Sequence, residues 1–185
     1  DPIERLFIQW GFSQVFPAKT MCAHVTTWNK NSSVKFRTDV AMMCKLGFDI
    51  KLADMSKDDE TYCRTAVQNY NRLKPVVLEG DMYRLVSPYG SNHTSTMYVG
   101  KDKDKAVVFA FDIHPRYAEK ILPVRLQGLD ADTMYRVKEI NLMPGANSSL
   151  SGNGEVFSGE FLMNVGLNLF TTQQLNSRVI EVVAE

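Results

Sequence analysis

The stretch Met21–Leu52, MCAHVTTWNKNSSVKFRTDVAMMCKLGFDIKL, decides the fold of this chain. A short apolar run is followed by a polar loop and then by apolar residues at helical spacing, Phe36, Val40 and Met43. Apolar and polar residues then alternate within Lys45–Leu52. The pattern predicts strand, helix and strand, with the two strands parallel and adjacent. Because one such unit cannot cover both faces of its own sheet, we expect it to belong to a larger α/β domain.

Helices are predicted on both sides of this unit. Asp1 followed by Pro2 is a strong helix start, since aspartate caps the free amides and proline is preorganised for the first helical position. We expect that helix to end at Gly11. After the unit, Ser56 begins a second helix, which we expect to stop at Pro75. The first part of the chain therefore predicts helix, strand, helix, strand and helix.

The character of the sequence changes after about residue 77. No convincing helical stretch follows, and short β-branched and aromatic runs are separated by turn-forming residues. This pattern predicts an antiparallel β-sandwich or barrel, of which we expect the sandwich. We expect residues 1–77 to form one domain and residues 78–185 the other. The predicted strands are Tyr83–Val86, Ser95–Gly100, Ala106–Ile113, Ile121–Leu126, Met134–Ile140, Glu155–Ser158 and Ser177–Val183.

Composition excludes several classes of function. The chain has 185 residues with 21 basic and 21 acidic side chains, so neither a nucleic acid nor an anionic membrane is an expected partner. Cys22, Cys44 and Cys63 form no CxxC pair and are interpreted as small core residues. No phosphate loop, dinucleotide motif or metal-ligand spacing occurs, so we expect no cofactor and no metal. No signal peptide or transmembrane run is present, and Asp1 in place of methionine suggests a processed or truncated start.

Candidate ligand-binding residues follow the first predicted strand. In an α/β barrel the reactive groups lie where strands end, which here brings His24, Trp28 and Asn29 to the mouth. Trp28 could stack on a sugar ring while Asn29 bonds its hydroxyls; alternatively, Trp28 caps the barrel edge and Asn29 makes a turn. His24 could equally make a core or loop hydrogen bond. Asp49 alone cannot be assigned as an acid or base, because glycoside hydrolysis typically needs two carboxylates.

Other polar residues are interpreted as structural. Arg37 and Asp39 lie on the helix of the central unit, where a structural ion pair or an exposed face is expected. His93 and His114 lie in the predicted β region without ligand spacing, and we expect both at the surface.

Five segments, in order, resemble a known family: DPIERLFIQWGFSQVFPAKTMCAHVT, FRTDVAMMCKLGFDIKL, YRLVSPYGSNHTSTMYV, LQGLDADTMYRV and SGEFLMNVGLNL. They are similar to the C-terminal end of family 36 glycoside hydrolases, the retaining α-galactosidases. The resemblance implies a large N-terminal β-sandwich, a central TIM barrel and a small C-terminal β-sandwich. This chain would then hold the last βα units of the barrel and the C-terminal domain.

The resemblance also implies where the catalytic groups lie. Asp1 and Pro2 resemble the end of the family's acid/base motif, so the nucleophile and the acid/base are both expected upstream of Asp1. A shift of that alignment would make Asp1 the acid/base. His24 matches a position that is commonly histidine in the family, whereas Trp28 replaces a small residue or proline, which weakens a transferred sugar contact. The isolated chain is expected to be inactive.

The resemblance implies a parent enzyme that removes terminal α-linked galactose from oligosaccharides by a retaining double displacement. We expect that parent to be a homo-oligomer. The sequence leaves its location open between the cytoplasm and the periplasm. An alternative is a non-catalytic β-sandwich module for stability, oligomerisation or weak carbohydrate binding. A further alternative is a different barrel glycosidase with the same C-terminal region.

Overall fold

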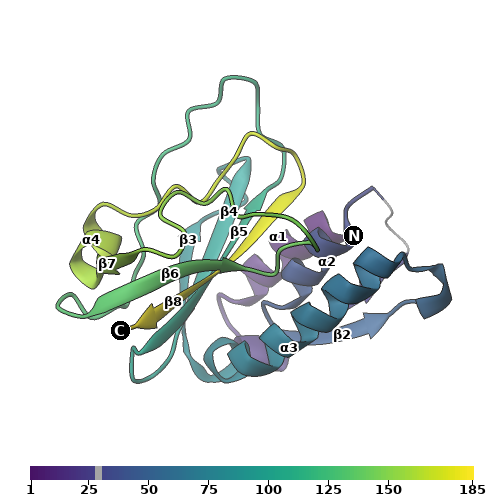
Figure 1. Cartoon of the computed structure of the whole chain (residues 1–185), viewed down its shortest axis with the longest axis horizontal. Coiled ribbons are helices and arrows are strands. Elements are labelled where there is room, and N and C mark those ends of the chain that lie inside the picture. Colours follow the sequence, from purple (N-terminus) through teal and green to yellow (C-terminus); the bar gives the residue numbers. More distant parts are fainter. Residues whose placement is uncertain (28–30) are drawn as a thin grey trace.

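The computed structural model describes residues 1–27 and 31–185, and Figure 1 shows the N-terminal helices on one side of a curved antiparallel sheet. The N-terminal part contains a two-stranded parallel sheet in which Cys22 pairs with Lys45 and Thr26 with Asp49. The predicted parallel strand–helix–strand unit is therefore confirmed. Its elements are α1 (Pro2–Phe12), β1 (Cys22–Thr26), α2 (Val34–Ala41), β2 (Lys45–Asp49) and α3 (Lys57–Glu79), with short 3-10 turns at Ala18–Thr20 and Leu52–Asp54.

Side-chain caps define where the helices begin. Asp1 accepts from the amide of Ile3 at 2.8 Å, and Ser56 accepts from the amide of Asp59 at 3.1 Å. Each cap satisfies an amide that has no partner within the helix. Both predicted helix starts are confirmed.

The predicted end of α3 at Pro75 is wrong, because the helix continues to Glu79. Proline in a helix loses one hydrogen bond and disfavours the preceding turn. Here the cost is offset by burial, since Val76 and Val77 are 8% and 2% exposed and pack in the core. Tertiary packing therefore extends α3 one turn beyond Pro75, where the local sequence predicted its end. The predicted boundary between residues 77 and 78 falls within this last turn.

The C-terminal part is one six-stranded antiparallel sheet with the order β3-β4-β5-β8-β6-β7. Residues predicted as the strand Ile121–Leu126 form only an isolated bridge, Val124 to Leu167. A short helix, α4 (Gly159–Asn164), occurs where none was predicted; Ser158 caps it by accepting from the amide of Phe161 at 3.1 Å. The strands are β3 (Asp81–Val86), β4 (His93–Val99), β5 (Lys105–Asp112), β6 (Met134–Ile140), β7 (Val156–Ser158) and β8 (Asn176–Ala184).

The sheet is the central layer of the molecule (Figure 1). Along β4 and β5 successive side chains alternate between two apolar clusters. Tyr98 and Phe109 pack with the helices, whereas Met97 and Val108 pack against the loops and α4 on the other face. The hydroxyl of Tyr98 donates to the carbonyl of Met43 at 2.8 Å. The α/β unit and the antiparallel sheet therefore share one core.

The cysteines differ in exposure, which corrects their interpretation as three core residues. Cys44 and Cys63 are buried. Cys22 is exposed because its side chain points to the face of β1 opposite the buried Ala23 and Val25. Burial raises the pKa of both the Cys44 and the Cys63 thiol to about 11. Only the thiolate is a good nucleophile, and at pH 8 a thiol with that pKa is ionised to roughly one part in a thousand.

We therefore expect that only one of the three cysteines is alkylated quickly in the native chain. Iodoacetamide at pH 8 should modify Cys22 first, because it is accessible, and Cys44 and Cys63 only after unfolding. Peptide mass spectrometry on native and urea-treated samples measures the three sites. Equal rates at Cys22 and Cys44 in the native chain would contradict this picture.

Candidate functional site

The two faces of β1 differ in character. Ala23 and Val25 are 0% and 1% exposed and pack toward the helices. His24 and Thr26 point to the opposite face, which the described residues leave open. Polar side chains on the open face, next to the carboxyl ends of two parallel strands, occupy the position where α/β proteins bind ligands. This open face of β1 and β2 is the candidate site.

His24 lies directly over Gly47, its register partner on β2. A Cβ atom at position 47 would lie 2.2 Å from Cδ2 of His24, closer than any real contact. Gly47 therefore leaves room for the imidazole on the strand. The sequence interpretation missed Gly47, although a glycine inside a strand often marks such a close approach.

The carboxyl end of β1 is held by Arg37 of α2. One guanidinium nitrogen of Arg37 donates to the carbonyl of Thr26, and Nε donates to the carbonyl of Ser33 at 3.4 Å. Burial lowers the pKa of Arg37, the largest of several effects on that group. A small cavity of about 30 Å³ lies at this corner. It is lined by Asp1, Pro2, Arg5, His24, Thr26 and Arg37.

Asp39 has a structural role at the junction of the two parts. Its side chain is fully buried, and Oδ2 lies 2.5 Å from Nζ of Lys35. It accepts from Tyr62 at 2.8 Å, from Ser177 at 2.7 Å and from Asn141 at 3.1 Å. Burial, with the carboxylate of Asp39 second, raises the pKa of Tyr62 well above its usual range, so its hydroxyl stays protonated and donates. Of the two expected roles, a structural ion pair and an exposed face, the first is observed.

The expected surface position of His93 is wrong. The residue is 5% exposed, and Nδ1 lies 2.8 Å from Oδ1 of Asp112, its cross-strand partner. Phe170 covers the ring, with centroids 4.7 Å apart. The residues that bury His93 come from distant loops, which the local sequence does not reveal. His114 is exposed and contacts Gln174 at 2.8 Å, as expected for a surface residue.

The other predicted site residues are placed as follows. His24 lies on the open face, whereas Trp28 and Asn29 lie outside the described residues. Within residues 1–27 and 31–185 no group of three or more His, Cys, Asp or Glu side chains is arranged to hold a metal ion. In the same ranges no helix is both long and apolar enough to cross a membrane.

The fold defines the chain as an α/β unit, with polar side chains on the open face of its parallel strands, packed on an antiparallel β-domain. Two family models match it. Residues 1–80 match "Melibiase", and residues 93–182 match "Glycosyl hydrolase family 36 C-terminal domain". The chain belongs to glycosyl hydrolase family 36 and contains its C-terminal domain.

Known relatives agree with this assignment. Alpha-galactosidase 2 of Hypocrea jecorina is 33% identical over 97% of this chain and 23% of the relative. Probable alpha-galactosidase G of Aspergillus terreus is 32% identical over 97% of this chain and 24% of the relative. The chain thus spans about a quarter of the length of the curated relatives it matches.

Solved structures show the same relationship. A variant of the α-galactosidase AgaA from Geobacillus stearothermophilus, in complex with raffinose, superposes with a TM-score of 0.86. It is 26% identical, and the match covers 100% of this chain and 25% of AgaA. A second AgaA structure, in complex with 1-deoxygalactonojirimycin, gives a TM-score of 0.86 at 27% identity, again over 100% of this chain and 25% of AgaA.

Proposed function

We propose that this chain is part of an α-galactosidase that removes terminal α-linked galactose from oligosaccharides with retention of configuration. The observation that carries the proposal is the fit of the whole chain, helices and sheet together, onto AgaA. The two family models agree with it, since one matches the helical part and the other the sheet. The relatives at 32–33% identity are α-galactosidases, and one AgaA structure contains raffinose. A galactose-containing oligosaccharide is therefore the substrate class we assign to the whole enzyme.

We infer that β1, α2, β2 and α3 are the last βα units of a TIM barrel, and that residues 78–185 form the C-terminal β-sandwich domain. The parallel pairing of β1 and β2 supports this, because barrel strands are parallel. An apolar groove of about 500 Å³ beside β2, lined partly by Phe48, Ile50 and Leu52, also supports it. Leu52 is 74% exposed, as expected for a surface that further barrel elements cover.

In this proposal the open face of β1 lines the barrel interior, and His24 contacts the substrate. Trp28 and Asn29, which follow β1 in the sequence, are proposed to bind the sugar as well. The nucleophile and the acid/base are proposed to lie upstream of Asp1. A double displacement needs one carboxylate to attack the anomeric carbon and another to protonate the leaving oxygen, then to activate water. Residues of this chain would orient the sugar for those steps.

Hydrolysis of an aryl α-galactoside tests the proposal. The enzyme expressed with its complete upstream sequence is expected to be active and the isolated chain inactive. In the complete enzyme, His24→Ala is expected to lower kcat/KM by about tenfold or more, through loss of a polar substrate contact. His114→Ala is the matched control, since that histidine is exposed. A folded complete enzyme without hydrolysis would refute the proposal, and full activity of His24→Ala would refute the role of His24.

A further inference from the structure

A separate cavity shares no lining residue with the small cavity beside His24. It has a volume of about 590 Å³, within the usual range for small-molecule sites, and lies where the start of α2 meets β6, β8 and two loops of the antiparallel part. We call it the α2–β8 cavity. Glu139 of β6 and Arg178 of β8 line it, together with carboxamide side chains from both loops.

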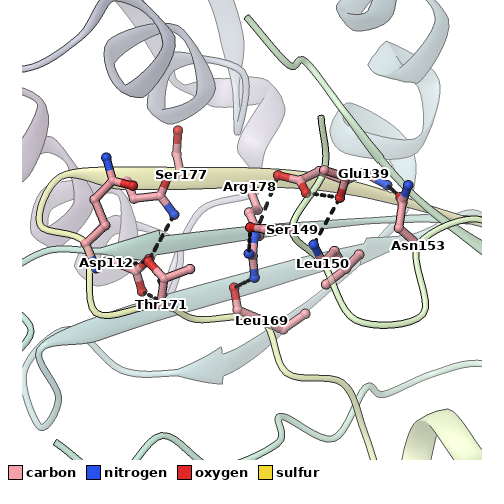
Figure 2. Close-up of polar contacts among 12 residues, drawn as sticks. Asp112, Glu139, Ser149, Leu150, Asn153, Leu169, Thr171, Ser177 and Arg178 are labelled. Atoms are coloured by element: carbon pink, nitrogen blue, oxygen red, sulfur yellow. Dashed lines mark hydrogen bonds and ion pairs between the residues drawn. The ribbon is translucent and has the colours of Figure 1, made fainter. Parts of the chain in front are cut away.

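Arg178 and Glu139 form a buried pair on this cavity (Figure 2). Each side chain is 5% exposed, and Nε of Arg178 lies 3.7 Å from Oε1 of Glu139. The guanidinium also donates to the carbonyl of Leu169 at 3.0 Å and to Oγ of Ser149 at 2.5 Å. The second oxygen of Glu139 accepts from Ser148. These bonds hold the lining in a fixed shape before any ligand enters.

The charges on the cavity wall are already compensated. Among the described residues of its lining, the cations are Lys35, which is paired with Asp39 at 2.5 Å, and Arg178, which is paired with Glu139. An anionic ligand such as phosphate would have to compete with these carboxylates for its counter-charge. A cationic ligand would meet a Glu139 that is bonded to Arg178 and Ser148. The electrostatics therefore favour a neutral ligand.

The remaining wall combines amides with small apolar surfaces. Asn147 and Gln173 bring carboxamides, each with two donors and an acceptor. Gln174 and Asn176 add two more, whose nitrogens already contact His114 at 2.8 Å and Asp112 at 3.0 Å. Sugar hydroxyls are donors and acceptors at once, so carboxamides satisfy them in either direction. Apolar side chains, Leu142, Met143 and Leu175, offer contact to the C–H faces of a ring. We propose that the α2–β8 cavity binds one or two rings of a neutral saccharide.

Titration of the 185-residue chain tests this binding without any hydrolysis. Calorimetry or NMR with raffinose, sucrose and galactose is expected to show saturable binding of at least one sugar, whereas inorganic phosphate should not bind. The double variant Asn147→Ala/Gln173→Ala is expected to weaken binding by roughly ten- to thirtyfold, since two hydrogen bonds are lost. Both residues are exposed in loops, so the fold should survive, and circular dichroism verifies this.

The matched control is Gln127→Ala/Asn164→Ala, which removes two exposed carboxamides outside the cavity and should leave affinity unchanged. No saturable binding of any of the three sugars would overturn the proposal. So would binding of phosphate in place of sugar, or sugar binding that the double variant leaves intact but His24→Ala abolishes. None of these outcomes depends on whether the complete enzyme hydrolyses galactosides.

Discussion

Replacing Asp39 with alanine is expected to lower the free energy of unfolding by about 3–5 kcal/mol. The carboxylate is fully buried and has four partners, which belong to α2, α3, β8 and the loop after β6. Its removal leaves the ammonium of Lys35, only 13% exposed, without its counter-charge. It also leaves the hydroxyl of Ser177 without an acceptor, and the hydroxyl of Tyr62 with only the carbonyl of Lys35, 3.4 Å away. Breaking one side of a buried ion pair costs far more than losing a surface pair.

Urea denaturation followed by circular dichroism measures this effect. Asp39→Asn keeps the shape and one acceptor oxygen, so it should cost less than the alanine variant. Asp102→Ala is the control, because Asp102 is exposed in the turn between β4 and β5, and it should change stability by no more than about 0.5 kcal/mol. A loss below about 1 kcal/mol for Asp39→Ala would show that the two parts do not depend on this carboxylate.

The sequence predicted those elements whose signals are local. The parallel unit within Met21–Leu52 has clear apolar spacing, and the caps at Asp1 and Ser56 are encoded within four residues. Where a distant residue decides the outcome, the prediction was incomplete or wrong. α3 passes Pro75 because the sheet and the neighbouring helices bury its last turn. α4 was missed because six residues are too few to show helical spacing.

The residues of the candidate site and its surroundings also fall into two groups: those that the local sequence singled out, and those whose surroundings depend on distant residues. The position of His24 near the end of a predicted strand, together with the resemblance, singled it out as a site candidate, and the structure places it on the open face of β1. The glycine within the second predicted strand could have indicated the close approach at Gly47. The partners of Asp39 could not have been found, since Asn141 and Ser177 lie 102 and 138 residues further along the chain. His93 is buried by Phe170 from another loop. Contacts that close over such separations depend on the whole topology rather than on local pattern.

Gly166→Ala is expected to lower the free energy of unfolding by about 3 kcal/mol or more. Gly166 has a φ of +89°, where an L side chain is strained by about 1–2 kcal/mol. In addition, its Cβ would lie 2.2 Å from the carbonyl oxygen of Val124, which is backbone and cannot move alone. That carbonyl belongs to the bridge between Val124 and Leu167, with hydrogen bonds of 2.8 and 3.0 Å. The substitution would therefore strain the backbone at residue 166 and separate Val124 from Leu167, which the bridge joins.

Gly145→Ala separates these two contributions. Gly145 has a φ of +75° but no atom within 4 Å of the added Cβ, so it carries the conformational strain without the collision. We expect it to cost about 1 kcal/mol, and the excess for Gly166→Ala measures the close approach to Val124. Thermal and urea unfolding of both variants provide the comparison. Equal losses in the free energy of unfolding would mean that the loops around Val124 and Leu167 rearrange at little cost. The bridge between these two residues would then contribute little to the apolar cluster on this face of the sheet.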